Sequence, residues 1–297
     1  MNDTTILTDG LHFGEGPRWH DGRLVVSDFY SHAVLSVSTH GSVETLFEVP
    51  GQPSGMGWLP DGRPLVVSMT DRRVLRMEPD GSASEHADLS GLATFHCNDM
   101  VVDRHGRAYV GNFGFDLHGF ISEHGEGALF NDPHSLATVL CLVQPDGSIG
   151  VAADEMLFPN GTVITPDGST LIVAETLGLR LTAFDIAADG SLANRRVWAD
   201  LSAELIAPDG ICLDASGAVW VANAVAHEAV RVAEGGAILE RVTTQQNCYA
   251  VCLGGDDGRT LFCCTAADSH PRVAAVERTA AIETATVTVG AADPPSP

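Results

Sequence analysis

The chain has 297 residues, and 16 basic against 39 acidic side chains give it a formal net charge of −23. All 16 basic residues are arginines, which excludes mechanisms that need a lysine, such as a Schiff base or a Walker-type phosphate loop. Clustered positive charge is what binds a phosphate backbone, so nucleic acid is not an expected partner. No apolar run is long enough to span a bilayer and the start of the chain lacks the features of a secretory signal, so we expect a cytoplasmic protein without a membrane partner.

The seven cysteines are an odd number and show no CxxC spacing. This pattern argues against a disulfide framework or a zinc cage. We therefore expect reduced cysteines that are mostly buried as small apolar residues.

A short turn followed by an apolar, β-branched-rich run recurs six times along the chain. The glycines of these turns are Gly22, Gly62, Gly106, Gly168, Gly217 and Gly258. Asp-Gly, or a similar pair, between two apolar runs predicts a hairpin. A second hairpin follows in most units, although its pattern in the sixth unit (272–289) is less clear. Four strands in each of six units predict an all-β fold, a six-bladed β-propeller with four antiparallel strands per blade.

No linker interrupts the repeat, so residues 1–292 are predicted to form a single propeller domain. The tail 293–297, DPPSP, is expected to be disordered. The spacing from Gly106 to Gly168 is 62 residues, longer than the other spacings, and it contains an insertion at about 113–136. Long insertions in compact domains are commonly lids or binding loops.

Equivalent positions on the innermost strands should point toward the propeller axis. Counting back eight residues from the turn glycines gives Ser54, Asn98, Asn160, Asp209 and Ala250, and a shorter first turn places Glu15 at the same position. Each polar residue alone can simply cap a turn at the start of a strand. Two carboxylates on one axis would repel each other, however, unless a cation lay between them. Carboxylate and amide oxygens without Cys or His suit Ca²⁺, Mg²⁺ or Mn²⁺ rather than zinc.

The glycines that follow two of these residues, in PNG and PDG, allow close backbone approach at the predicted site. Four stretches then complete a recognisable pattern. They are GEGPRW (14–19), CNDMVVDRHGRAYVGNFGF (97–115), FPNGTVITPDGSTLIVAET (158–176) and PDGICLDASGAVWVAN (208–223). On these stretches the chain resembles the SMP-30/gluconolactonase/LRE (regucalcin-like) family over nearly its whole length.

The resemblance implies a six-bladed propeller with one divalent cation on its axis. It implies that Glu15, Asn160 and Asp209 are the metal ligands and that Asp209 is also the catalytic acid/base. Ca²⁺ is the expected cation, with Mg²⁺, Mn²⁺ or Zn²⁺ as alternatives. Asn98 matches the position that contacts substrate or completes the metal site. His96 stands where sugar lactonases of the family usually carry an arginine that holds substrate hydroxyls.

In this family the insertion resembles a lid, which would bring Asp116, His118, Glu123 or His124 near the substrate. The predicted activity is metal-dependent hydrolysis of a sugar-type lactone to the hydroxy acid, with Asp209 as general base and the cation polarising the carbonyl. Direct attack by Asp209 on the ester is a less favoured variant.

Two other readings stay open at this point. One is a metal-dependent phosphotriesterase or arylesterase with the same architecture, and the other is a noncatalytic propeller scaffold held together by its cation. The expected partner is a small lactone or ester. The oligomeric state is left open.

Overall fold

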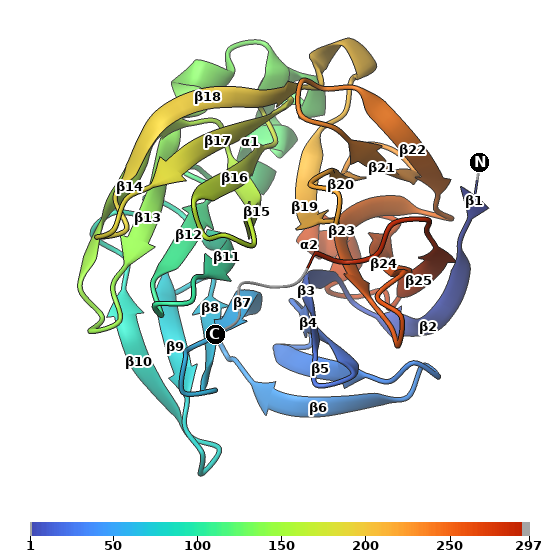
Figure 1. Cartoon of the computed structure of the whole chain (residues 1–297), viewed down its shortest axis with the longest axis horizontal. Helices are drawn as coiled ribbons and strands as arrows, with labels where there is room; N and C mark the ends of the chain where they lie inside the picture. The colour runs from blue at the N-terminus through green and yellow to red at the C-terminus, as the bar shows by residue number, and fades with distance from the viewer. Residues whose placement is uncertain (1, 293–297) are drawn as a thin grey trace.

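Strands make up most of the protein, whose computed structural model describes residues 2–292. The strands form six sheets arranged around a central axis (Figure 1). Within each blade the strands pair antiparallel, and the innermost strands of neighbouring blades contact one another around the axis. The predicted six-bladed β-propeller with four antiparallel strands per blade is confirmed.

The first blade contains β3 (Gly14–His20), β4 (Arg23–Asp28), β5 (Ala33–Val37) and β6 (Val43–Glu48). The second contains β7 (Pro53–Trp58), β8 (Pro64–Ser68), β9 (Arg73–Met77) and β10 (Ala83–Asp88). The third contains β11 (Cys97–Val102), β12 (Ala108–Asn112), β13 (Thr138–Val143) and β14 (Ile149–Met156).

The fourth blade contains β15 (Pro159–Ile164), β16 (Thr170–Glu175), β17 (Arg180–Ile186) and β18 (Leu192–Asp200). The fifth contains β19 (Pro208–Leu213), β20 (Val219–Asn223), β21 (Glu228–Val232) and β22 (Ile238–Thr243), to which β1 (Asn2–Asp3) adds a short parallel pairing. The sixth contains β23 (Asn247–Gly254), β24 (Thr260–Ala266), β25 (Ala280–Thr286) and β2 (Thr5–Leu11).

The sixth blade differs from the sequence expectation, because the N-terminus supplies its outer strand. The pattern of a second hairpin at 272–289 was less clear than in the other units, and there Pro271–Ala274 forms the short helix α2 and only β25 follows it. The partner of β25 is β2, with Thr5 opposite Thr284 and Leu11 opposite Ala280. Figure 1 shows β2 beside β25 at the edge of this blade. The two ends of the described chain therefore close the ring together.

A buried carboxylate also stabilises the contact between the two ends of the chain. Glu283 of β25 accepts hydrogen bonds from the hydroxyls of Thr265 (2.7 Å) and Thr4, and from the backbone N–H of Gln245 (3.0 Å). Glu283 is fully buried. The N-terminal segment thus supplies one of the partners that this carboxylate needs in the core.

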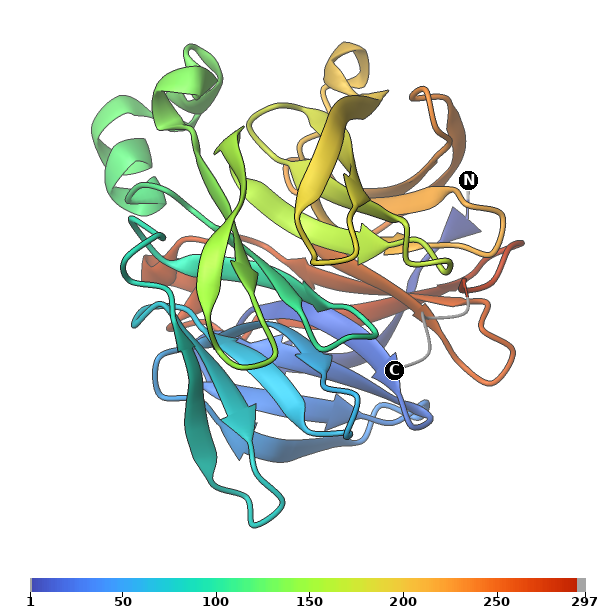
Figure 2. The ribbon, with the colours of Figure 1, turned by 60° about the vertical axis from the view of Figure 1, so that its left-hand side comes forward.

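The insertion at 113–136 forms three helical segments. They are α1 (Leu117–His124) and the 3₁₀ helices η1 (Glu126–Phe130) and η2 (Pro133–Leu136). Figure 2 shows these segments, in green, standing out from the body of strands. A further 3₁₀ helix, η3 (Ser202–Glu204), precedes the inner strand of the fifth blade. Within residues 2–292 no helix is both long and apolar enough to cross a bilayer.

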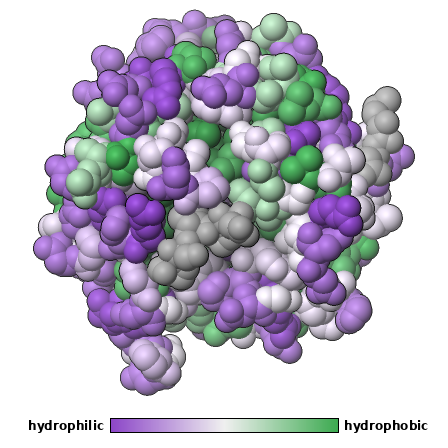
Figure 3. Space-filling model, viewed as in Figure 1, coloured by the Kyte–Doolittle hydropathy of each residue, from purple (hydrophilic) through white to green (hydrophobic). Residues whose placement is uncertain are grey.

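The strands alternate their apolar side chains between the two neighbouring blades, as a period of two residues requires. Val219 and Val221 of β20 pack in a cluster with Ile172 of the fourth blade, whereas Trp220 between them packs with Leu261 of the sixth. All seven cysteines are free, and six of them are buried, as expected. The face drawn in Figure 3 carries hydrophilic side chains around much of its periphery, with hydrophobic ones scattered among them.

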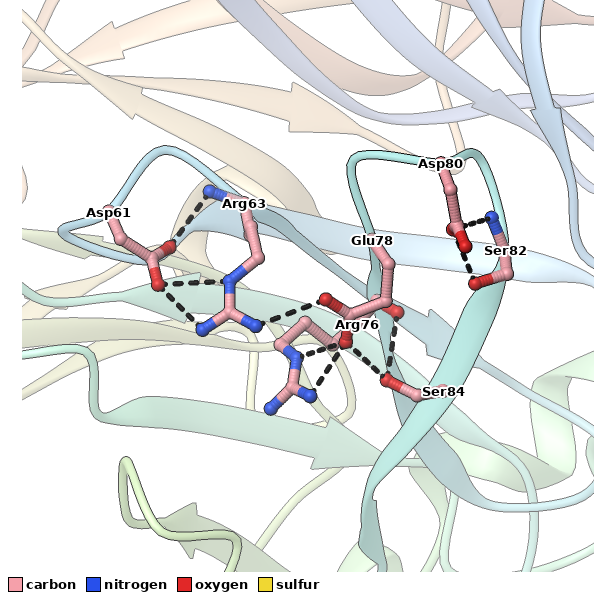
Figure 4. A network of polar contacts seen from close by, with 7 residues as sticks. All are labelled: Asp61, Arg63, Arg76, Glu78, Asp80, Ser82 and Ser84. Atoms are coloured by element: carbon pink, nitrogen blue, oxygen red, sulfur yellow. Dashed lines mark hydrogen bonds and ion pairs between the residues drawn. The ribbon is translucent and has the colours of Figure 1, made fainter.

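The predicted tight turns are stabilised by the aspartates that precede their glycines. Asp80 accepts the N–H of Ser82 at 3.0 Å and Asp61 accepts that of Arg63 at 3.1 Å, the geometry of an Asx turn (Figure 4). The same bond recurs at Asp146, Asp167, Asp189 and Asp257, each followed by glycine, and at Asp214, which lies three residues before Gly217. Most of the Asp-Gly pairs in the sequence therefore mark the same hydrogen-bonded turn.

In the second blade these turns join a network of charged side chains (Figure 4). Glu78 accepts hydrogen bonds from Ser84 (2.7 Å), Arg76 (2.7 Å) and Arg63 (3.1 Å). The Ser84 bond and the two arginine bonds lower the pKa of Glu78 to about 2. Arg63 thus links Asp61 to Glu78, and Arg76 pairs with Glu78, so both arginines stabilise this part of the second blade.

We expect removal of residues 1–11 to destabilise the whole propeller, because β25 would lose its partner and Glu283 would lose Thr4. The free energy of unfolding should fall by at least the roughly 2–5 kcal/mol that one buried leucine such as Leu11 contributes. Urea denaturation followed by circular dichroism measures this. Removal of residues 1–3 alone is the control and should change stability little. Equal stability of the two truncated proteins would contradict the closure described above.

Candidate functional site

Each innermost strand is interrupted near its start by a shift in register. The shifts lie between Glu15 and Arg18, Pro53 and Met56, Cys97 and Met100, Pro159 and Thr162, Pro208 and Ile211, and Cys248 and Ala250. A bulge of this kind re-aims the side chain at its position. Six bulges at one level around the axis therefore make a ring of redirected side chains.

Four of the side chains predicted for this ring line one cavity of about 700 Å³. They are Glu15, Asn98, Asn160 and Asp209, and each is only 5–7% exposed. Ser54 does not line the cavity; it is 1% exposed, and its hydroxyl donates to the amide oxygen of Asn98 at 3.5 Å. The ring predicted from the sequence thus contains four residues that are far apart in the chain and line one cavity in the structure.

The sixth ring position is occupied by Tyr249 and not by Ala250, so that expectation was wrong. In β23 the residue bulged out between the paired Cys248 and Ala250 is Tyr249, and it is Tyr249 that lines the cavity. This strand runs one residue further before its turn, since its pairing extends to Gly254. Counting back from the turn glycine therefore placed the ring one residue too late.

The backbones of neighbouring inner strands approach closely at the next position. A Cβ atom on Gly161 would lie 2.4 Å from the carbonyl oxygen of Asp209, and one on Gly210 would lie 2.6 Å from Ala250. Neither clash can be relieved by a flexible side chain, because the atoms met are backbone or Cβ atoms. The glycines of PNG and PDG are therefore needed for close approach, as predicted.

The third blade breaks this pattern and supplies a residue that the sequence analysis missed. Asp99 occupies the position that glycine fills in four other blades, and it is buried. Its carboxylate accepts the N–H of Met100 (2.8 Å) and a bond from the guanidinium of Arg18 (3.1 Å). The signal was present in the aligned strands as Asn-Asp in place of Asn-Gly or Asp-Gly.

The two axial acids are held in an environment that favours their protonated forms. Burial raises the pKa of Glu15 well above its usual value, and the negative charges of Asp209 and Asp99 raise it further. Burial, and then the charge of Asp99, likewise raise the pKa of Asp209. A divalent cation between them would offset both effects.

The hydrogen bonds around the ring leave one acidic oxygen free. Oδ1 of Asp209 is buried and has no hydrogen-bond partner in the described part of the chain. The amide of Asn160, by contrast, is fixed, because its nitrogen donates to the hydroxyl of Thr176 (3.2 Å), which in turn donates to the carbonyl of Pro208 (2.8 Å). Thr176 was not singled out in the sequence, although it ends the stretch LIVAET.

The donor set therefore fits a hard cation bound by oxygen. No group of three or more His, Cys, Asp or Glu side chains within residues 2–292 is placed to hold a metal. A site on this axis must therefore use the amide oxygens of Asn98 and Asn160 together with the two carboxylates. That mixture of oxygen donors suits Ca²⁺ or Mg²⁺ better than zinc.

His96 and His118, named from the sequence as substrate contacts, both line the cavity. The ring of His96 stacks on Phe95 with 4.2 Å between centroids, and burial is the main cause that lowers its pKa. His118 lies 4.9 Å from His270 between ring centroids. Burial and the neighbouring His270 lower the pKa of His118 to about 4. An unpaired histidine with these pKa shifts is neutral at pH 7.

The other insertion residues lie elsewhere. Asp116 is exposed and caps helix α1 by accepting the N–H of Gly119 at 2.9 Å, and it is not among the residues that line the cavity. Glu123 and His124, at the end of α1, are also exposed and do not line it. The insertion instead reaches the cavity with Leu117, His118, Ile121, Glu126, Leu129 and Phe130.

In comparisons with known proteins, the family model described as SMP-30/Gluconolactonase/LRE-like region matches residues 13–267. The chain belongs to this family. Regucalcin of Gallus gallus is 28% identical over 178 residues, which are 59% of this chain and 56% of that protein, so the match spans little more than half of this relative. Regucalcin of Bos taurus is 26% identical over 268 residues, covering 89% of this chain and 86% of the relative.

Several solved structures share the fold of this chain at low sequence identity. A luciferin-regenerating enzyme superposes with a TM-score of 0.78 at 16% identity, covering 96% of this chain and 95% of the other. A gluconolactonase from Xanthomonas campestris gives 0.72 at 23% identity, covering 95% and 89%. A calcium-binding regucalcin from Agrobacterium tumefaciens gives 0.73 at 18% identity, covering 98% of each chain.

For the metal-free protein we expect Asp209→Asn to stabilise the fold. The substitution removes a buried like charge, so the free energy of unfolding should rise by about 1 kcal/mol or more, which is roughly 2 °C or more in Tm. Because the pKa values of Glu15 and Asp209 are raised in the folded state, these two acids should destabilise the fold more and more as pH rises from about 4 to 7. The gain from Asp209→Asn should therefore be larger at pH 7 than at pH 4.

Differential scanning fluorimetry with chelator and with added Ca²⁺ measures this. Ca²⁺ should raise the Tm of the wild type more than that of Asp209→Asn. Asp268→Asn, which removes an exposed carboxylate from the same cavity, is the matched control. A Ca²⁺ response of equal size in all three proteins would show that the cation does not bind at the axis.

Proposed function

We propose that this protein is a divalent-metal-dependent lactonase that hydrolyses a cyclic ester to the corresponding hydroxy acid. The observation that carries the proposal is the buried Asp209 carboxylate, with an unpartnered oxygen, at a cavity of about 700 Å³. Membership of the SMP-30/gluconolactonase/LRE-like family supports the same reaction class. The structural likeness to a gluconolactonase agrees with it at the level of the fold.

Glu15, Asn160 and Asp209 would hold the cation, and Asn98 either completes this set or contacts the substrate. Ca²⁺ is proposed because the donors are carboxylate and amide oxygens, and because the likeness includes a calcium-binding regucalcin. When bound, the cation supplies positive charge for the ester carbonyl oxygen and acidifies water in the site. The fixed amide of Asn160 keeps its nitrogen on Thr176, so its oxygen is the atom left for a ligand.

Asp209 would act as the acid and base of the reaction. Its unpartnered oxygen takes a proton from the attacking water while the new C–O bond forms at the carbonyl carbon. When the ring C–O bond breaks, the same carboxyl returns the proton to the departing oxygen, giving the hydroxy acid. With the cation bound, Asp209 would be ionised and able to accept a proton, and the acidified water would be a better proton donor to it.

His96 and His118 would contact the substrate as neutral hydrogen-bonding groups. His96 lies two residues before Asn98 in the chain and lines the same cavity. Neither histidine brings the fixed positive charge and paired donors of an arginine. Asp116 would act only indirectly, by holding the start of helix α1 through its bond to Gly119.

The cavity favours an enzyme over the alternative of a noncatalytic scaffold. A cation that only held blades together would need no room beside it, yet the four ring residues open into a space that would accommodate a small molecule. A phosphotriester or aryl ester would fit the same oxygen donors, so these substrates belong in the same assay.

We expect Asp209→Asn to lower kcat by about 10³-fold or more, because the amide cannot accept the proton from water. Release of acid from a panel of sugar, simple and aryl lactones, aryl esters and phosphotriesters, followed in a pH-stat with added Ca²⁺, measures this. Asp268→Asn is the matched control and should retain activity within a few-fold. Full activity of Asp209→Asn would rule out its assigned role, and turnover of phosphotriesters alone would replace the lactonase proposal.

A further inference from the structure

The cavity continues into a side groove that the proposed reaction does not use. This groove of about 500 Å³ lies between the 3₁₀ helix η1 and the fifth blade. It shares five lining residues with the cavity, namely Glu126, Phe130, Ala207, Val225 and Asn247. The two spaces therefore adjoin, which lets part of a molecule held over the axial ring lie in the groove.

The walls of the groove are apolar although they face solvent. Leu205 is 73% exposed, Val225 46% and Phe130 36%, three of the large hydrophobic side chains that the described chain leaves exposed. Leu179 also lines the groove. Exposed apolar side chains that gather along one groove are typical of a binding surface, whereas single ones are ordinary.

Two of these leucines also adopt an unfavourable backbone conformation. Leu205 follows η3 with φ of 54° and Leu179 lies in the turn between β16 and β17 with φ of 47°. In this left-handed region glycine or asparagine is preferred, and a bulky residue is strained. Both strained positions thus carry a large apolar side chain into the same groove.

The charge of the groove restricts what it can hold. Glu126 is the one charged residue that lines it in the described part of the chain. A carboxylate or phosphate would be repelled by Glu126 and would find no cationic partner there. The chemistry favours a neutral apolar group.

We infer that the substrate is a lactone ring that carries a neutral apolar chain, with the ring above Glu15 and Asp209 and the chain in the groove past Phe130, Val225 and Leu205. The inference rests on the proposed lactonase function for the ring. It assigns a substrate class distinct from the polyhydroxylated sugar lactones, because hydroxyls placed in the groove would be left without partners against these side chains.

The first test varies chain length on a constant ring. Wild-type protein with Ca²⁺ is assayed on δ-valerolactone, δ-octalactone, δ-decalactone and δ-dodecalactone, with glucono-δ-lactone for comparison. Each methylene that enters the groove should raise kcat/KM by about three- to fourfold until the groove is filled. The alkyl lactones should exceed glucono-δ-lactone. A flat or falling dependence on chain length would overturn the inference.

Substitution in the groove provides the second test. Leu205→Asn is suited to it because asparagine tolerates the left-handed conformation, so the fold should be retained. The ratio of kcat/KM for δ-dodecalactone to that for δ-valerolactone should fall by about tenfold or more. Leu239→Asn is the matched control, since Leu239 is 50% exposed on β22 of the same blade and lines neither space. An equal ratio in the two variants would contradict the assignment.

A binding measurement separates failure of this inference from failure of the proposed function. The lactams of the same rings, δ-valerolactam and its 6-heptyl derivative, resist hydrolysis and are titrated by calorimetry. Tighter binding of the heptyl lactam, weakened by Leu205→Asn, supports the groove even if no lactone is opened. Equal affinity for both lactams would overturn it. Self-association of the wild type that Leu205→Asn abolishes, with no dependence on chain length, would assign the groove to a second copy instead.

Discussion

The burial of two carboxylates at one axis is the constraint on which the rest of this site depends. Glu15 and Asp209 come from the first and fifth blades and are brought to one axis. Burial raises the pKa of both, the charge of Asp209 raises that of Glu15 further, and the charge of Asp99 raises both. Arg18, whose charge reaches Glu15, pairs instead with Asp99, and Asp99 adds a third negative charge. Such an arrangement is unfavourable without a cation. The fold therefore carries a local cost that the divalent ion of the proposed function would relieve.

The repeated inner strands hold the two buried acids at the axis. Six inner strands each bulge at the same level, and the tightly approached glycines Gly161 and Gly210 fix neighbouring backbones there. The ring residues are held by the sheets rather than by flexible loops, so the acids cannot move apart to lower their repulsion. The loops, by contrast, differ from blade to blade. The insertion after β12 and the turn after β20 supply the apolar groups, such as Phe130 and Val225, that surround the opening.

Local signals explain what could be predicted from the sequence. The Asp-Gly turns and the alternating apolar runs are short-range features, and they indicated both the blades and the ring of Glu15, Asn98, Asn160 and Asp209. The pairing of β2 with β25 joins opposite ends of the chain, and no local pattern indicates it. Tyr249 was missed because one strand is a residue longer before its turn. Asp99 was visible as an exception to the glycine pattern, but its pairing with Arg18 depends on packing between blades.

The closure of the ring has a consequence for the order in which the molecule becomes functional. Strand β2 ends at Leu11 and β3, which carries Glu15, begins at Gly14, so only two residues separate the closing strand from the strand of an axial acid. The partner of β2 is β25, with Thr5 opposite Thr284, 279 residues later in the chain. During synthesis β2 therefore stays without its partner until β25 has emerged. Pairing of these two strands also brings β3 beside β23 of the sixth blade, so the circle and the axial ring are completed in the same step.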